Sequence, residues 1–441
     1  MQRIRHLLAV LAARSREAAA YLGRQLPWYE PAHSQEGRNL RSLYGATTWF
    51  GIISGLAATF VPVFALRLGA TTGQLGWLAA LPALVNVVWL VPAARIIERR
   101  RRRLPLILST ALLQRLGYLA MAIMPFVLSR GRVEALILLQ ALVTLPTAVV
   151  NTAVTTLIPD LTSPQRRGQV VSVRWLLLAV TATVAALAGG AFLDLFPVPL
   201  NYQLLLGAGA LLSFLSLPSL RRIRMPDAVT LARAGTPRRR YSWRQVRESL
   251  ASVKAQPEFL GFSLAAFVFH WGLYLPAALW SILRVRDLGA TDTWIGIIAV
   301  VVDGTTIAGY LYWARISKQR GDRWLLVITS LGVSLYAAAT ALVPTIGWMV
   351  PTSILGGLTW AGCNLALFNV MLRVSPAARR PTYVAIYTAL MNVTAFAGPL
   401  LGAGLADWIG VRNTFLVSGA VRMVGALLMW RLVRDGQPED Q

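Results

Sequence analysis

One segment of this chain occurs twice, about half a chain length apart. The repeated positions are Leu68-Gly69-Ala70-Thr71, Gly76, Ala94-Arg95-Ile96, Arg100 and Arg103, found again as Leu288-Gly289-Ala290-Thr291, Gly296, Ala314-Arg315-Ile316, Arg320 and Arg323. The offset between the copies is 220 residues (288 − 68 = 220). A later pair of segments, from Arg166 to Asp194 and from Arg379 to Asp407, agrees at an offset of 213 (407 − 194 = 213). The chain is therefore a duplicated half, and we expect two similar units that pack on each other.

The composition excludes an ordinary soluble enzyme. Hydrophobic residues make up 56% of the 441 residues and charged residues only 14%, with a mean hydropathy of +0.56. A soluble domain carries about 25% charged residues. The single cysteine, Cys363, excludes a disulfide framework and a multi-cysteine metal site, and no cofactor is expected. The formal net charge of +25 would suggest a nucleic-acid partner in a soluble protein, but here the arginines lie between apolar segments, so no nucleic acid is expected.

Apolar segments of about 20 residues, each long enough to cross a hydrocarbon core of about 30 Å, occur along the whole chain. We predict twelve membrane-spanning helices near residues 42–66, 73–94, 104–128, 133–158, 169–193, 200–220, 257–283, 293–314, 323–343, 347–373, 381–407 and 412–432. These runs are too long and too rich in Leu and Ala for alternating barrel strands.

The basic residues predict the orientation in the membrane. With the N-terminus inside, the cytoplasmic segments hold 34 of the 43 Lys and Arg residues, and the outer loops hold six. This bias follows the positive-inside rule and predicts that both termini are cytoplasmic.

Five regions follow from this topology. We predict a basic cytoplasmic tail over 1–41, a six-helix bundle over 42–220, a cytoplasmic linker over 221–256, a second six-helix bundle over 257–432 and a short tail over 433–441. The first tail is either an amphipathic surface helix held by the anionic inner leaflet or a disordered segment. The linker contains Arg238-Arg239-Arg240 and is interpreted as facing the lipid headgroups.

The loop after the second span resembles a family signature. The major facilitator superfamily of secondary transporters carries G-x-L-A-D-R-x-G-R-R there in each half, and the segment from Ala94 to Arg103 is similar to it, with Glu98 in the acid position and Arg101 where glycine is expected. The second copy, from Ala314 to Arg323, keeps the glycine as Gly321 but has Lys318 in the acid position. This resemblance implies an all-α membrane fold of twelve helices in two pseudo-symmetric bundles.

The resemblance also implies a charge latch at the cytoplasmic mouth. Glu98 is the candidate acid, and the predicted cytoplasmic gate residues are Arg95, Glu98, Arg99, Arg174 and Arg315. Arg174 lies about one turn inside the cytoplasmic face, where it could pair with Glu98. The alternative is that these charges only keep the loops on the cytoplasmic side.

Two further family motifs are incomplete. The antiporter motif G-P-x-x-G-G is missing from the fifth span, and the eleventh span instead contains Gly398-Pro399-Leu400-Leu401-Gly402. Close packing of small residues explains both segments equally well. The arginine that many proton-driven antiporters carry in the fourth span is absent, and Gln140 and Thr144 lie in its region.

Asp303 and His270 are titratable residues near the middle of predicted membrane spans, where a charged side chain is costly and a functional role would explain its presence. A charge at mid-bilayer costs at least about 2.5–3.5 kcal/mol, and of the 18 acids only Asp303 lies near the middle of a predicted span. His270 lies midway along the seventh span, and histidine titrates near physiological pH. We predict that both take part in proton coupling. The alternative is a structural, hydrogen-bonded role for each.

The substrate site is expected on the cavity helices that the resemblance implies, the first, fourth, seventh and tenth. Asn151 and Asn364 occupy equivalent places in the two halves (364 − 151 = 213) and could bind a solute from opposite sides. They could equally bond to neighbouring helices. The predicted substrate-binding residues are Trp49, Gln140, Asn151, Trp271, Tyr274, Trp360 and Asn364.

The outer side carries its own candidate gate. Asp194 and Asp407 end equivalent helices, where an acid opposes the helix dipole, so an arginine partner is expected. The predicted outer-gate residues are Arg67, Asp194, Arg286 and Asp407, with exposed helix-end charges as the alternative. Arg115 and Arg422 are expected to pair locally or to snorkel.

These features predict a secondary active transporter in the plasma membrane that moves a small solute by alternating access. The solute is expected to be neutral, amphipathic or weakly cationic, with protons as the coupling ion, export as the direction and a monomer as the unit. The alternative is a membrane scaffold, sensor or lipid-handling protein of the same fold without coupled transport. No enzyme activity is expected.

Overall fold

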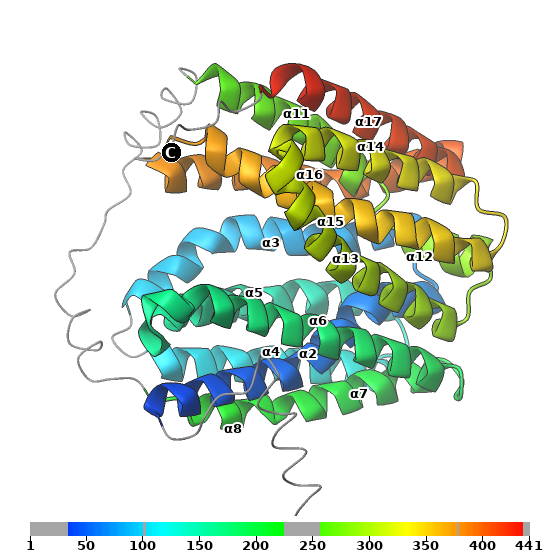
Figure 1. Ribbon diagram of the computed structural model, residues 1–441. Helices are drawn as coiled ribbons and strands as arrows, with labels where there is room; N and C mark the ends of the chain where they lie inside the picture. The colour runs from blue at the N-terminus through cyan, green and yellow to red at the C-terminus, as the bar shows by residue number, and fades with distance from the viewer. Residues whose placement is uncertain (1–33, 100–102, 225–255, 377–378, 435–441) are drawn as a thin grey trace, which may run out of the picture.

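The computed structural model describes residues 34–99, 103–224, 256–376 and 379–434, and the regular structure in these ranges is helical. Figure 1 shows two bundles stacked on each other, the first coloured blue to green and the second green to red. The first bundle contains α2 (Gln35–Arg67), α3 (Thr72–Arg99), α4 (Arg103–Val127), α5 (Arg132–Leu161), α6 (Arg167–Leu193), α7 (Leu200–Phe214) and α8 (Ser216–Arg221). The second contains α11 (Pro257–Tyr274), α12 (Leu279–Ile282), α13 (Asp292–Arg320), α14 (Asp322–Ala341), α15 (Met349–Val374), α16 (Arg380–Ile409) and α17 (Val411–Leu432). Short 3₁₀ turns precede α6 and α15, and the π-helical turn η3 (Leu283–Asp287) follows α12.

Eleven helical segments of the described residues are long and apolar enough to cross a membrane, and they match eleven of the twelve predicted spans. The span predicted at 73–94 corresponds to α3, a 28-residue helix with two internal prolines, which stays a predicted span. Helix α2 begins at Gln35, seven residues before the predicted bundle boundary (42 − 35 = 7), because the Ser34 side chain accepts a hydrogen bond from the Gly37 N–H at 2.9 Å and caps it. Residues 1–33 of the predicted basic tail and residues 225–255 of the predicted linker lie outside the described residues.

The repeated Leu-Gly-Ala-Thr segment is a helix-to-helix turn in both halves. Gly69 and Gly289 adopt positive φ angles of 93° and 64°, which a residue without a Cβ adopts at little cost. The threonine that follows caps the next helix: Thr71 Oγ1 accepts the Gln74 N–H at 3.2 Å, and Thr291 Oγ1 accepts the Trp294 N–H at 3.4 Å. The copied sequence therefore encodes a copied chain reversal.

We call the end of the molecule where α2 begins and α17 ends the terminal end, on the left in Figure 1, and the opposite end, with the two copied turns, the distal end. The halves meet along two seams, α3 against α16 and α6 against α13. The repeat-equivalent glycines Gly76 and Gly296 mark these crossings. A Cβ on Gly296 would lie 2.7 Å from the Ala186 carbonyl oxygen, and one on Gly76 would lie 3.0 Å from the Ala403 Cβ. Each seam is thus a close helix crossing that a glycine permits.

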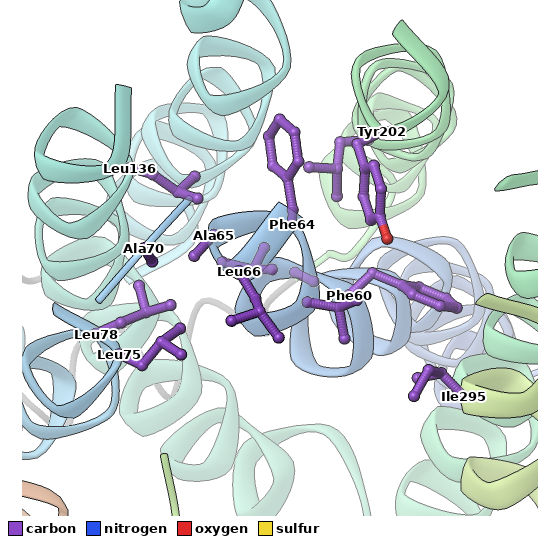
Figure 2. Close-up of a cluster of buried hydrophobic side chains, with 14 of the residues drawn as sticks. Phe60, Phe64, Ala65, Leu66, Ala70, Leu75, Leu78, Leu136, Tyr202 and Ile295 are labelled. Carbon is purple, nitrogen blue, oxygen red and sulfur yellow. The ribbon is translucent and has the colours of Figure 1, made fainter. Parts of the chain in front are cut away.

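The buried apolar residues form one cluster that joins the halves and three that do not, the smallest of them Ile298, Val343 and Met349 of the second half. The distal cluster contains Phe60 and Phe64 of α2 together with Ile295 of α13 (Figure 2). Phe415 of α17 belongs to the same cluster. The rings of Phe64 and Tyr202 stack with centroids 4.8 Å apart. Toward the terminal end, the cluster around Leu40 and Ile97 contains only first-bundle residues, and the cluster around Phe259, Tyr383 and Val433 only second-bundle residues. The halves therefore share a core at the distal end and keep separate cores at the terminal end.

Candidate functional site

A cavity of about 410 Å³ lies in the second bundle, within the usual range for a small-molecule site. Its walls come from α11, α15 and α16, from mid-helix toward the terminal end. The lining residues are His270, Tyr274, Trp360, Asn364, Leu367, Phe368, Met371, Val384, Tyr387, Thr388, Met391 and Asn392. Four of these, His270, Tyr274, Trp360 and Asn364, were predicted from the sequence as coupling or substrate-binding residues.

Sequence reasoning missed the α16 wall. Val384, Tyr387, Thr388, Met391 and Asn392 recur at spacings of three and four residues, which puts them on one helix face. The same spacing on α15 brings Trp360 and Asn364 to the cavity with Leu367, Phe368 and Met371. This periodic stripe was visible in the sequence, but α16 corresponds to the eleventh span, outside the set of helices that the family resemblance pointed to.

His270 is 8% exposed and is fixed by its own helix. Its Nδ1 lies 2.7 Å from the Ala266 carbonyl oxygen. Because a carbonyl only accepts hydrogen bonds, Nδ1 carries a proton, and Nε2 is an acceptor when the ring is neutral and a donor when it is protonated. The rings of Tyr274 and Tyr387 lie 6.2 and 6.5 Å from the imidazole, centroid to centroid. His270 is therefore the polar centre of an aromatic wall.

The cavity carries two amides and no carboxylate. The Asn364 side chain donates to the Tyr310 hydroxyl of α13 at 2.7 Å, and the Asn392 side chain donates to the Thr388 carbonyl oxygen at 2.8 Å. Both amide oxygens stay available as acceptors within the cavity wall. The lining can thus hydrogen-bond a polar solute without offering it a fixed charge.

The remaining predicted substrate residues are not on this wall. Trp49 of α2 and Trp271 of α11 are half-buried, Asn151 of α5 is exposed, and none of the three lines the cavity. Gln140 lies in the first bundle, with its side-chain oxygen buried and without a hydrogen-bond partner among the described residues. The walls of this cavity come from the second half alone, so it brings Asn364 but not Asn151 to the solute, and the pairing of the two amides across one site stays a prediction.

Asp303 bridges the two halves. Its Oδ2 accepts a hydrogen bond from the Thr183 hydroxyl at 2.8 Å, from α13 to α6. The contact lies in the middle of the α6–α13 seam, between helices that Gly296 and Gly190 hold close together. Asp303 is half-buried and is not part of the cavity wall. The two predicted coupling residues thus occupy different places, His270 in the cavity and Asp303 in the seam.

Polar contacts join the halves at the distal end. Arg67 donates to the Ala290 carbonyl oxygen at 3.2 Å, and Arg286 donates to the Ala70 carbonyl oxygen at 2.7 Å. Ala70 and Ala290 are repeat equivalents (290 − 70 = 220), so the two arginines clasp equivalent turns in opposite directions. Arg67 also lies 3.9 Å from the Asp292 carboxylate.

Asp194, for which an arginine partner is expected, has none among the residues that the structure describes. Its carboxylate accepts the backbone N–H groups of Asp292 at 3.0 Å and Thr293 at 2.9 Å, at the amino end of α13. Burial by itself would raise the pKa of Asp194, but these hydrogen bonds outweigh it and hold the pKa below its ordinary value. The positive end of the α13 dipole replaces the predicted side chain. Asp407 is exposed and has no ion pair with any residue that the structure describes.

The predicted cytoplasmic gate is only partly visible. The side chains of Arg95, Glu98 and Arg99 lie outside the described residues. Arg315 is exposed on α13, and Arg174 is half-buried with its guanidinium 5.8 Å from the ring of its neighbour Trp175. The pairing of Arg174 with Glu98 stays a prediction.

Arg115 and Arg422 pair locally, as predicted. Arg115 donates to the Ser216 hydroxyl at 2.7 Å and to the Ala111 carbonyl oxygen at 2.8 Å. Arg422 donates to carbonyl oxygens of Gly272 and Val333 at 3.2 and 3.1 Å. Both arginines bind helices of their own bundle.

Known proteins resemble this chain at three levels. The family model described as Major Facilitator Superfamily matches residues 43–277 and 260–441. The "Multi-drug resistance efflux pump PmrA homolog" of Lactococcus lactis is 25% identical over 116 residues, which cover 26% of this chain and 28% of that protein. The "Probable sugar efflux transporter" of Helicobacter acinonychis is 23% identical over 194 residues, which cover 39% and 44%. These matches span less than half the length of either relative.

The fold agrees with solved transporter structures. The crystal structure of the nucleoside transporter NupG superposes with a TM-score of 0.69 at 13% identity, covering 90% of this chain and 99% of that chain. At this identity the likeness shows the fold alone. The family model, which accounts for both halves of this duplicated two-bundle fold, establishes that the chain belongs to the Major Facilitator Superfamily.

Proposed function

We propose that this membrane transporter is a secondary active carrier that moves a small neutral, amphipathic or weakly cationic solute by alternating access. The observation that carries the proposal is the unequal closure of the two ends. The halves share one apolar core and a set of polar contacts at the distal end, whereas the terminal end has separate cores and the cavity. A carrier caught with one side closed has this arrangement.

The positive charge of the loops indicates which face of the membrane lies nearer the cavity. The terminal end carries the basic segments, so the positive-inside rule assigns it to the cytoplasm. On this assignment the structure is the inward-facing state, with the outer side closed by Arg67, Arg286 and Asp194.

The cavity wall supports the solute class. Trp360, Tyr387 and Phe368 offer ring faces that stack on flat solutes and attract cations. Asn364 and Asn392 supply hydrogen bonds, and no carboxylate demands a full positive charge. A polyanion would find no arginine or lysine among the lining residues.

Asp303 supports proton coupling. A carboxylate in the middle of a membrane seam is costly when charged, and protonation removes that cost. Its bond to Thr183 joins the two halves, so a change of charge at Asp303 acts on the contact that must alter when the halves rock. His270 is the second proton-binding candidate, placed where the solute would bind.

Export from a bacterial-type plasma membrane is the direction we propose. The relatives named above are described as efflux proteins, and an aromatic cavity that opens to the cytoplasm can take up amphipathic compounds from that side.

Removing the ring of Phe368 tests the cavity directly. Phe368 lines the cavity and is 56% exposed, so Phe368→Ala removes binding surface with little effect on packing. We expect the affinity for a monocationic aromatic dye to fall by about tenfold, or about 1.4 kcal/mol, in equilibrium fluorescence titrations of the purified protein. The control is Trp408→Ala, because Trp408 is 83% exposed and lies outside the cavity. Equal affinities in the two variants would place dye binding elsewhere.

Transport itself is tested in sealed vesicles. Purified protein in vesicles with an imposed pH gradient should move neutral or monocationic aromatic solutes faster than protein-free vesicles do. Binding without any gradient-driven flux across such a panel would favour a scaffold, sensor or lipid-handling role over a carrier.

A further inference from the structure

The two seams between the halves are related by the repeat, but their distal ends are built differently. In the α6–α13 seam, Asp194 at the end of α6 meets the first turn of α13. The repeat places Asp407 of α16 opposite the first turn of α3 in the same way (407 − 194 = 213; 292 − 72 = 220). The sequence therefore offers one carboxylate to each seam.

Only the α6–α13 seam uses its carboxylate. Besides the two backbone N–H groups that Asp194 accepts, the Tyr202 hydroxyl donates to Asp292, and Arg67 lies 3.9 Å from the same side chain. Asp292 is only 4% exposed, so this cluster is shielded from water. We call Arg67, Asp194, Tyr202 and Asp292 the distal latch.

The counterpart seam has no such cluster among the described residues, and the charged contact beside it is the hydrogen bond from Arg286 of η3 to the Ala70 carbonyl oxygen, just before α3. The residues at the start of α3 that correspond to Asp292 and Thr293 are Thr72 and Gly73, which bring no carboxylate. The amino end of α3 is capped within its own half, where the Thr71 N–H donates to Gln74 Oε1 at 2.8 Å and the Gln74 N–H donates back to Thr71. Asp407 is left exposed.

We propose that the distal latch holds the closed distal end from one side, so that Asp194 sets the population of this state and its repeat twin Asp407 does not. Hydrogen bonds that involve a charged partner are about twice as strong as neutral ones, and these tie α6, α7 and α2 to the start of α13. Opening of the distal end must break all of them on this seam, whereas the α3–α16 seam parts without losing an ion pair or a charged hydrogen bond at Asp407. The proposal rests on alternating access but not on the solute or the coupling ion.

The experiment measures distances across both ends with pairs of spin labels. Cys363→Ser removes the single native thiol and keeps a group that can bond Ser330. The distal pair is Arg130→Cys with Thr345→Cys, and the terminal pair is Ser163→Cys with Gln319→Cys. All four sites are exposed, and each pair joins one half to the other. Distance distributions in lipid nanodiscs then report which end is open.

Asp194→Ala is compared with Asp407→Ala as its matched control. We expect Asp194→Ala to raise the ratio of distal-open to distal-closed molecules by at least about tenfold, with the terminal pair moving closer as the distal pair separates. Asp407→Ala should leave both distributions unchanged. Equal shifts in the two variants, or no shift in Asp194→Ala, would overturn the proposal.

A milder variant keeps the test decisive if Asp194→Ala does not fold. Tyr202→Phe removes only the hydroxyl that donates to Asp292 and leaves the ring stacked on Phe64. It should shift the same two distributions in the same direction by a smaller factor, and an unchanged distal distance would count against the latch. None of these measurements uses a solute or a pH gradient, so a failed latch leaves the transport proposal standing.

Discussion

Asp303→Asn is expected to reduce proton-driven solute flux to the level of protein-free vesicles while solute binding stays intact. Asparagine has nearly the same size and can still accept a hydrogen bond from Thr183, but it cannot take up or release a proton. The cavity residues are distinct from Asp303, so the dye affinity should not change. Flux measured with an imposed pH gradient checks the loss of transport, and fluorescence titration checks that the dye affinity is unchanged.

Thr183→Val is the matched control for this result. It removes the hydrogen bond at 2.8 Å but keeps the carboxyl group of Asp303, so flux should keep its dependence on the pH gradient even if its rate changes. Gradient-driven flux that survives in Asp303→Asn would remove Asp303 from the coupling step, and His270 would then be the remaining candidate.

Gly402→Ala is expected to give the largest loss of stability of any single methyl group added to the second bundle. A Cβ on Gly402 would lie 1.8 Å from the carbonyl oxygen of Leu275, a backbone atom that no rotamer change can move aside. Helices α16 and α11 would have to separate, and overpacking of this kind costs about 1–3 kcal/mol or more. Thermal unfolding in detergent, followed by loss of the monodisperse peak, measures the effect.

Gly404→Ala separates this clash from helix propensity. Gly404 lies on the same helix two residues later, and a Cβ there would meet nothing within 4 Å. Both substitutions gain the same helix propensity, about 1 kcal/mol in favour of alanine. Gly404→Ala should therefore unfold at or above the wild-type temperature. Similar losses in both variants would mean that the α16–α11 contact can relax at little cost.

The same glycine contact shapes the cavity. One turn earlier on α16, a Cβ on Gly398 would lie 2.6 Å from the Cβ of Tyr274, a cavity residue. The segment Gly398-Pro399-Leu400-Leu401-Gly402, which resembles an antiporter motif in the wrong half, thus packs α16 against α11 through its glycines and against α3 through Pro399. These contacts agree with the explanation by close packing of small residues that was given for this segment from the sequence.

The repeat and the composition were enough to predict a helical membrane fold, and eleven of the twelve predicted spans match long apolar helices of the described residues. The copied Leu-Gly-Ala-Thr turn and the apolar runs indicated two equivalent halves. At the two copied turns, a glycine and a capping threonine determine where one helix ends and the next begins. Asp303 could be singled out because one carboxylate in the middle of an apolar run is conspicuous. His270 stood out as the single histidine within a predicted span, and Tyr274 as an aromatic residue one turn away from it.

The sequence did not predict where the two repeat-related halves differ from each other. Asn151 and Asn364 are equivalent in the repeat, yet only Asn364 lines the cavity, because the cavity walls come from the second half alone. The partner of Asp194 was missed because it is a pair of backbone N–H groups, which every residue but proline carries. The contact between the end of α6 and the start of α13 depends on how the two bundles pack together, and no local sequence pattern predicts that packing.

The shared distal core has a thermodynamic consequence for this protein. Separation of the halves at that end would expose the apolar faces around Phe60, Phe64 and Ile295 to water, and such exposure raises the heat capacity. The equilibrium between the two states should then curve with temperature, and cooling should weaken the apolar contribution that favours closure. The population of the distal-closed state should therefore fall on cooling, because the hydration of this one apolar cluster contributes to the free-energy difference between the two states.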